Sequence, residues 1–261
     1  MPGVTLTETS STQSQLAALD LLTDEMRRLM EGGSKTLLAG VWHQLDISAI
    51  YHDCALEGQV ISPAELRSAL DGFSVADVAT LPMFTAFRSH KRALELVREL
   101  AANERTAFSL DLFHRFHELF ASGADDGRGL PLRREIPLHR SYFHEIDEPQ
   151  KILPDLKRLA TWLNDPAERN DEHPVLFAAG FHSRFMAIFP FAETSGKVGR
   201  AMMNLLLLRE GYLPAVIHAT ERQRYYEVLR QPGSGLIDLV IESALASTEA
   251  AARFLREAET A

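Results

Sequence analysis

The residues from Leu176 to Gly211 constrain the fold most, because they have the pattern of two helices joined by a tight loop. Apolar residues recur at helical spacing in the first half. Pro190 ends that helix, because proline has no backbone N–H and its ring crowds the preceding turn. The second helix is expected to begin near Lys197 and to end at Arg209, just before Gly211. The sequence therefore predicts a helical hairpin at the centre of the protein.

The loop between these two helices carries residue types that are typical of an anion site. Thr194 and Ser195 are good N-cap residues, and Gly196 lets the backbone come close to a ligand. The first N–H groups of the second helix have no partner within the helix, and Lys197 and Arg200 add positive charge at the same end. These features predict a phosphate-binding site. An ordinary capped helix with a surface lysine and a structural arginine is the alternative.

Glu193, immediately before this loop, is a candidate metal ligand. A carboxylate at this place can hold a divalent cation that bridges phosphate oxygens. We therefore expect Mg²⁺ to accompany a nucleotide or phosphate ligand.

The same stretch resembles the signature of Fic-domain proteins. In that signature a helix ends in His-Pro-Phe, followed by any residue, Asp or Glu, Gly-Asn-Gly-Arg, two more residues and Arg. The corresponding run here is FPFAETSGKVGR, from Phe189 to Arg200. The match stays in register from His182 to Pro214. The resemblance implies an all-α fold, a Fic-type helical bundle with a short β-hairpin flap.

The departures from the signature affect the expected chemistry. Fic enzymes mostly transfer AMP, or another phosphate-containing group, from a nucleotide to a hydroxyl side chain of a target protein, and the family's histidine is the general base. Phe189 stands in its place, and a phenyl ring cannot accept a proton. Thr194 and Ser195 replace Gly-Asn, and Lys197 replaces the first arginine, which keeps the charge but loses the bidentate fork. The resemblance thus implies a site that keeps the family's overall pattern but lacks its general base.

Three functions remain open at this stage. The first is a non-standard transferase acting on a nucleotide or other phosphate-bearing ligand, whose acceptor is already ionised or whose base is His182, His139 or Asp53. The second is a catalytically inactive Fic-fold protein that binds a nucleotide or a protein partner and regulates it. The third is a pocket rebuilt around Phe189 and Phe191 for unrelated small-molecule chemistry. We favour the first, although His182 fits a core residue better than a base.

A second segment, Asp53 to Gly58, resembles the inhibitory helix of many Fic proteins. That helix carries Ser or Thr, three residues, then Glu followed by Gly or Asn, and its glutamate pairs with the second signature arginine and blocks productive nucleotide binding. Asp53 departs from the Ser or Thr, whereas Glu57 matches. The resemblance implies a regulatory ion pair between Glu57 and Arg200. The alternative is that Glu57 merely ends an exposed helix.

The segment from Arg134 to His139 alternates polar and apolar residues, which favours a short hairpin. In Fic proteins this position is the flap, which holds the target's segment by strand pairing. Pro137 would interrupt that pairing, because it offers no N–H. The flap is therefore expected to hold a small molecule, or nothing, in place of a protein segment, and a protein partner there stays open. Its basic patch is Arg133, Arg134, His139 and Arg140.

The rest of the chain predicts helices over 13–30, 37–56, 62–73, 81–103, 109–122, 153–164, 219–230 and 235–257. The domain plan is a loose tail over 1–12, an N-terminal helical region over 13–105 with the inhibitory-like segment around 53–59, a Fic-like core over 106–235 and a C-terminal helix over 236–261. His114 and His117 lie three residues apart, but no third metal ligand is evident.

Composition limits the partners and the cell compartment. The 261 residues carry a formal charge of −9, which argues against general nucleic-acid binding. No apolar run is long enough to cross a bilayer, and a single cysteine, Cys54, is typical of a reducing compartment. We expect a bacterial, cytoplasmic protein that binds a nucleotide or phosphorylated small molecule, without nucleic-acid or membrane partners, and leave a homodimer open.

Overall fold

The computed structural model describes residues 10–72, 81–103, 106–121, 131–137, 144–169, 172–231 and 233–259. Within these ranges the chain is helical and contains no β-strand, as the all-α prediction requires. The α-helices are α1 (Ser10–Gly32), α2 (Lys35–Leu56), α3 (Pro63–Leu70), α4 (Leu81–Ala101), α5 (Leu110–Phe120), α6 (Pro149–Asn164), α7 (Pro174–Ile188), α8 (Ser195–Arg209), α9 (Arg222–Arg230) and α10 (Ser234–Glu259). Two short 3-10 turns, η3 (Pro166–Glu168) and η4 (Ala219–Glu221), precede α7 and α9.

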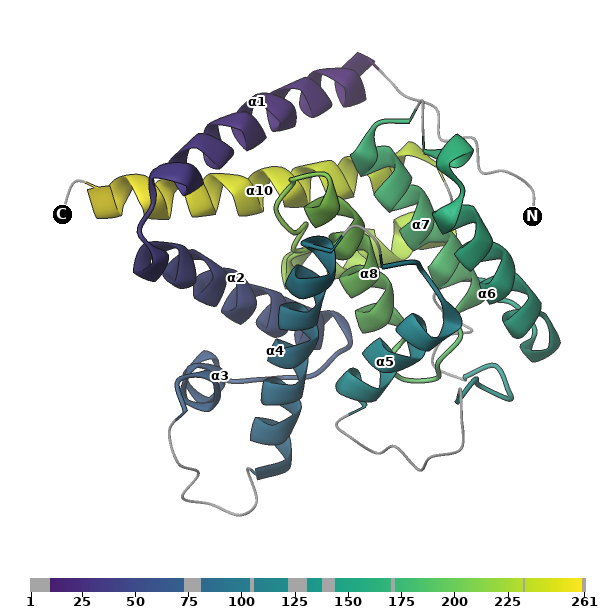
Figure 1. Ribbon diagram of the computed structural model, residues 1–261. Coiled ribbons are helices and arrows are strands. Elements are labelled where there is room, and N and C mark those ends of the chain that lie inside the picture. The colour runs from purple at the N-terminus through teal and green to yellow at the C-terminus, as the bar shows by residue number, and fades with distance from the viewer. Residues whose placement is uncertain are drawn as a thin grey trace.

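The helical hairpin predicted from the sequence forms the centre of the fold. Helices α7 and α8 lie side by side and are apolar on nearly all sides, so they are buried within the bundle (Figure 1). Gly199 allows their close approach, because a Cβ there would lie 3.1 Å from Cδ1 of Phe185. The loop between the two helices is therefore held in a rigid frame.

The other helices surround this pair. Helices α4 and α5 contact α8, whereas α6 and α10 contact α7. The long helix α10 lies against α1, and α2 packs against both α10 and α4 (Figure 1). The C-terminal end of α2 therefore comes near the start of α8, although the two are far apart in sequence. No helix among the described residues is both long and apolar enough for a membrane span.

The predicted helices are confirmed, with shifts at their ends. Helix α1 begins at Ser10, so the prediction of a loose tail as far as residue 12 is wrong for residues 10–12. Thr12 is buried, and its hydroxyl donates to Oδ1 of Asp238 at 3.0 Å, which fixes this first turn. Helix α6 begins at Pro149, four residues earlier than predicted.

The flap hairpin is not seen in the part of it that the structure describes. Residues 134–137 form no strand, and His139 lies outside the described residues, as does Arg140. The backbone N–H of Arg133 donates to the carbonyl of Pro190 at 2.9 Å, which ties this segment to the loop after α7.

Candidate functional site

Phe189 caps the C-terminal end of α7 in a left-handed conformation, with φ 45° and ψ 63°. It is the one non-glycine residue with positive φ among those described, and such a backbone is strained for a bulky side chain. Its phenyl ring is fully buried, with its centroid 6.1 Å from that of His144. The residue at the position of the family's base therefore belongs to the core.

Arg133 holds this turn in place. Its Nε donates to the carbonyl of Phe189 at 2.6 Å and its Nη2 to that of Ile188 at 3.1 Å, and Nη2 also donates to the carbonyl of Asp147. These bonds satisfy carbonyls that the end of α7 leaves without helical partners. The prediction that Arg133 belongs to a basic surface patch is therefore wrong, because its side chain is buried.

The hydroxyls of the loop do not cap α8, contrary to the prediction. Ser195 lies inside the helix, where its Oγ accepts from the N–H of Phe191 at 2.8 Å and donates to the carbonyl of Phe191 at 2.7 Å. Thr194 is the N-cap residue without a side-chain cap, and its Oγ1 lies 2.6 Å from Nδ1 of His117. The His117 ring also stacks on Phe191, with centroids 4.4 Å apart. His117 thus acts as an anchor for the loop.

Arg200 is 2% exposed and donates in three directions. Its Nη2 lies 3.1 Å from Oε1 of Glu57, which confirms the ion pair expected from the sequence. Its Nε lies 2.5 Å from Oδ1 of Asp53, and its Nη1 lies 3.3 Å from the hydroxyl of Tyr225. Arg200 was expected to bind phosphate, but in this conformation two carboxylates and a phenol take its donors.

Asp53 also belongs to this cluster, and its contacts with Arg200 and His90 did not follow from the sequence. Its second oxygen, Oδ2, lies 3.1 Å from Nε2 of the buried His90. Burial alone would raise the pKa of the Asp53 carboxyl, but Arg200 and His90 together hold this pKa well below its usual range. Burial lowers the pKa of His90, so the neutral imidazole donates its Nε2–H to Asp53. The only sequence signal was the Asp in place of the family's Ser or Thr.

Gly196 allows Glu57 to reach the start of α8. A Cβ at Gly196 would lie 2.1 Å from Oε1 of Glu57 and 3.0 Å from Nη1 of Arg200. A negative group is favoured here by the helix dipole and by the unpaired N–H groups of the first turn. The Glu57 carboxylate therefore occupies the place that the sequence analysis assigned to an anion.

His182 is a core residue, as expected from the sequence, where it fitted a core position better than a catalytic base. It is fully buried, and its Nε2 lies 2.9 Å from the hydroxyl of Tyr225. Burial, together with the nearby charge of Arg200, lowers the pKa of His182 to about 3. The imidazole is therefore neutral and is linked to Arg200 through the hydroxyl of Tyr225. His139, the other histidine proposed as a base, lies outside the described residues.

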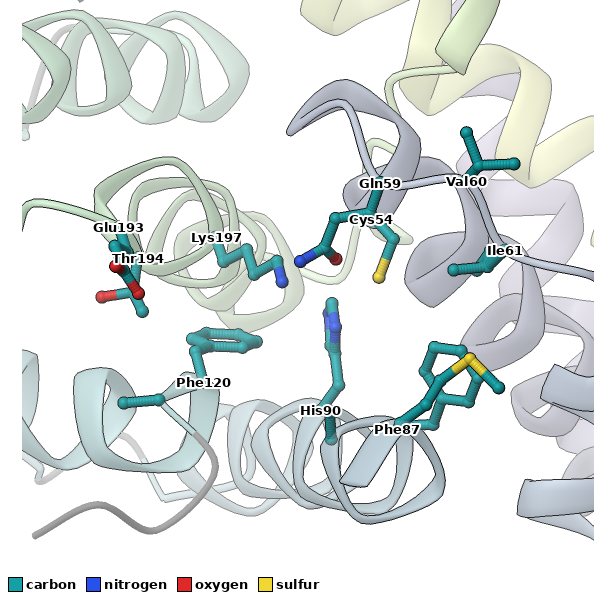
Figure 2. A pocket seen from close by; sticks show the side chains of 13 residues that line it. Cys54, Gln59, Val60, Ile61, Phe87, His90, Phe120, Glu193, Thr194 and Lys197 are labelled. Carbon is teal, nitrogen blue, oxygen red and sulfur yellow. The ribbon is translucent and has the colours of Figure 1, made fainter. Parts of the chain in front are cut away.

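A cavity of about 420 Å³ opens beside the loop, between α2, α4, α5 and α8 (Figure 2). Glu193, which is exposed, and Lys197 both line it. The other lining residues are Cys54, Gln59, Val60, Ile61, Met83, Ala86, Phe87, His90, Phe120, Ala121 and Thr194. Phe189 is not among them. The structure thus brings together Glu193, Thr194 and Lys197 at one cavity, and Glu57 with Gly196 and Arg200 next to it.

Residues 103–207 match the family model described as the Fic/DOC family. This match, together with the relatives and solved structures below, supports membership of the Fic/DOC family. It is similar to protein adenylyltransferase Fic of Culex quinquefasciatus, with 28% identity over 190 residues that cover 72% of this chain and 37% of the relative. The corresponding protein of Drosophila mojavensis is 25% identical over 225 residues, which cover 85% of this chain and 43% of the relative. The chain thus spans less than half the length of these two relatives.

Solved structures support the Fic-type fold. A Fic domain containing signaling protein from Bacteroides thetaiotaomicron superposes with a TM-score of 0.81 at 18% identity, covering 92% of this chain and 98% of that chain. Fic-1 from C. elegans, residues 134–508, superposes with a TM-score of 0.76 at 22% identity, covering 96% and 74%. At these identities the likeness concerns the fold alone.

Proposed function

We propose that this chain is a divergent Fic-type transferase that acts on a nucleotide or another phosphate-bearing ligand, and that the described conformation is its closed state. The relatives are named protein adenylyltransferase Fic, which supports a nucleotide as the donor. The observation that carries the proposal is the position of Glu57. Its carboxylate lies against Gly196 at the start of α8 and pairs with Arg200, which is the place where a phosphate would lie.

The site opens when Glu57 leaves α8. The N–H groups of the first turn and the Lys197 ammonium then face the same space. Lys197 binds phosphate as a point charge, in contrast to the fork of an arginine. Asp53 still holds Nε of Arg200 after Glu57 has left, so Arg200 gains only one free edge. The regulatory role assigned to Glu57 from the sequence is thus proposed here together with a second carboxylate, Asp53.

The missing base favours an acceptor that is already an anion. Phe189 cannot accept a proton, and His182 is buried and is not among the residues that line the cavity. An oxygen of an acceptor carboxylate or phosphate attacks a phosphorus atom of the nucleotide. The bond from that phosphorus to the leaving phosphate oxygen breaks, and its electron pair leaves with this oxygen. The attacking oxygen carries no proton, so the reaction needs no base at position 189.

Glu193 fits the expected Mg²⁺. Magnesium at nucleotide sites is held by one or two carboxylates together with phosphate oxygens, and Glu193 is an exposed carboxylate at the cavity. Among the described residues there is no group of three or more His, Cys, Asp or Glu that could hold a metal ion. Glu193 would therefore hold the ion jointly with the ligand. The bound ion would neutralise charge on the phosphates.

Calorimetric titration with ATP, CTP and inorganic phosphate, each with and without Mg²⁺, tests this proposal. We expect Mg²⁺-dependent binding that strengthens in Glu57→Gly and weakens in Lys197→Gln. The control is Lys91→Gln on α4, because Lys91 lies outside the cavity lining and its ion pair with Glu95 is long at 3.9 Å. Absence of binding in the wild type and in Glu57→Gly would contradict the proposal.

A nucleotide-binding protein without turnover is the second candidate function, and the buried Phe189 favours it. Release of pyrophosphate from ATP in the presence of acetate or inorganic phosphate as acceptor separates the two. Release by Glu57→Gly, and none without the acceptor, supports a transferase. Binding without release supports the second candidate.

A further inference from the structure

The cavity in Figure 2 has two chemically different ends. One end is polar and begins at Glu193 and Thr194. Lys197 and Gln59 approach each other above His90 nearer the middle of the cavity (Figure 2). The other end is apolar and is formed by Ile61 and Phe87. Met83 also lines the cavity and packs against the same hydrophobic cluster as Ile61 and Phe87. A volume of about 420 Å³ lies within the roughly 300–1,000 Å³ range that is typical of small-molecule sites. The cavity therefore has the size and the two-sided character of a ligand pocket.

The charges at the polar end indicate the sign of a ligand. Lys197 has no carboxylate partner among the described residues, in contrast to Arg200 one turn later, which has two. His90 is neutral, because burial lowers its pKa and its Nε2 donates to Asp53. The ammonium of Lys197 thus supplies the positive charge at this end of the cavity, and it lacks a counter-ion within the described protein.

Glu193, at the same cavity, limits the charge that a ligand can carry. Without a bound cation, the second charge of a dianion such as a phosphate monoester would be repelled by the Glu193 carboxylate. A single carboxylate needs only the ammonium. The apolar end requires the rest of the molecule to be hydrophobic.

We infer that this cavity binds a small amphipathic monocarboxylate, with its carboxylate at Lys197 and its apolar body against Ile61, Met83 and Phe87. The site shares Lys197 with the proposed phosphate site at Gly196, but its apolar wall lies outside that site, and its ligand is a different chemical class from a nucleotide. The walls also include Gln59 to Ile61, which directly follow Glu57, and His90, which holds Asp53. A ligand in this cavity therefore contacts residues that adjoin Glu57 in the chain and the histidine that pairs with Asp53, the two acidic residues that hold Arg200.

Three related compounds test this site by calorimetric titration of the full chain without nucleotide. Phenylbutyrate carries both the head and the body, phenylbutyramide keeps the body but has no charge, and butyrate keeps the head with little apolar body. We expect phenylbutyrate to bind and the other two to bind at least about tenfold more weakly, which is the usual effect of losing a hydrogen bond to a charged group or most of the apolar contact.

Variants locate the binding in this cavity. Lys197→Gln should weaken phenylbutyrate binding about tenfold, whereas Lys91→Gln should leave it unchanged. Ala86→Phe should abolish it by filling the space, with circular dichroism used to confirm that the variant is folded. The inference is overturned if phenylbutyrate does not bind, if its amide binds equally well, or if folded Ala86→Phe or Lys197→Gln retains the wild-type affinity.

Discussion

The replacement of Asp53 by serine removes the carboxylate that joins Arg200 to His90. Its two oxygens lie 2.5 Å from Nε of Arg200 and 3.1 Å from Nε2 of His90, and its side chain is only 14% exposed. Each hydrogen bond to a charged group contributes about 1.5–3 kcal/mol. Breaking a buried ion pair by removing one partner typically costs about 3–5 kcal/mol. We therefore expect Asp53→Ser to lower the free energy of unfolding by about 3–5 kcal/mol.

Glu57→Gln should cost less, because Glu57 contributes one hydrogen bond to Arg200 and Asp53 remains as a counter-ion. Urea denaturation at neutral pH measures both variants, with the unfolding free energy extrapolated to water. Asp46→Ser is the matched control on the same helix, since Asp46 is a buried aspartate whose oxygens lie 2.6 and 3.1 Å from Arg98. The control should also be destabilised, but without any change at α8. A loss below about 1 kcal/mol in Asp53→Ser would refute the reasoning, since that is the size of an ordinary substitution.

The pH dependence of the unfolding free energy distinguishes the contribution of the Asp53 charge from that of its packing. The folded-state pKa of Asp53 lies below its unfolded value, which is about 3.9. Its contribution to stability is therefore fully present above that value and is lost as the pH falls from it towards the lower folded-state pKa. The difference in unfolding free energy between wild type and Asp53→Ser should be constant above about pH 5 and shrink below about pH 4.

Three further predictions concern residues around the site. Gly196→Ala places a Cβ 2.1 Å from Oε1 of Glu57, so it should displace that carboxylate and destabilise the protein. Adding Glu57→Gln should then lower the unfolding free energy, measured by urea denaturation, by little more. Fully additive losses of unfolding free energy in the double variant would contradict this. The pKa of His182 is lowered to about 3, so its contribution to stability should be present above about pH 6.5 and be lost as the pH falls towards 3. His182→Gln should therefore flatten the pH dependence of the unfolding free energy between these two values. An unchanged slope would contradict this role of His182. Arg133→Met should lower the free energy of unfolding by about 2–4 kcal/mol, because it leaves carbonyls at the end of α7 unsatisfied. Arg134 is exposed, so Arg134→Met should change the free energy of unfolding by less than about 0.5 kcal/mol. Equal effects of the two variants in thermal denaturation would contradict the role of Arg133.

The helices and the central hairpin could be predicted from the sequence, because apolar spacing and Pro190 carry a local signal. The Glu57–Arg200 pair also followed from residues that match a known motif. The roles of Thr194 and Ser195 did not follow, because good N-cap residues can also bond elsewhere. His117 takes the hydroxyl of Thr194, and the main chain of Phe191 takes that of Ser195.

Long-range contacts account for the remaining differences. Arg133 reads as a basic surface residue until the end of α7 is seen to bring carbonyls around its guanidinium. In the sequence, Asp53 is only a departure from a motif. The structure shows that α8 and α4 bring Arg200 and His90 to its two oxygens. Both arrangements join segments that are 37 or more residues apart, and no local pattern encodes them.

The central claim is that Glu57 and Asp53 together withhold Arg200 and the start of α8 from a phosphate ligand. The affinity for Mg²⁺-ATP, measured by calorimetry in the wild type, Glu57→Gly and the double variant Glu57→Gly with Asp53→Ser, tests it most directly. The affinity should rise at each step, and Glu57→Gly with Asp46→Ser should bind like Glu57→Gly alone. A double variant that binds no more tightly than Glu57→Gly, or that is matched by the Asp46 control, would contradict the account.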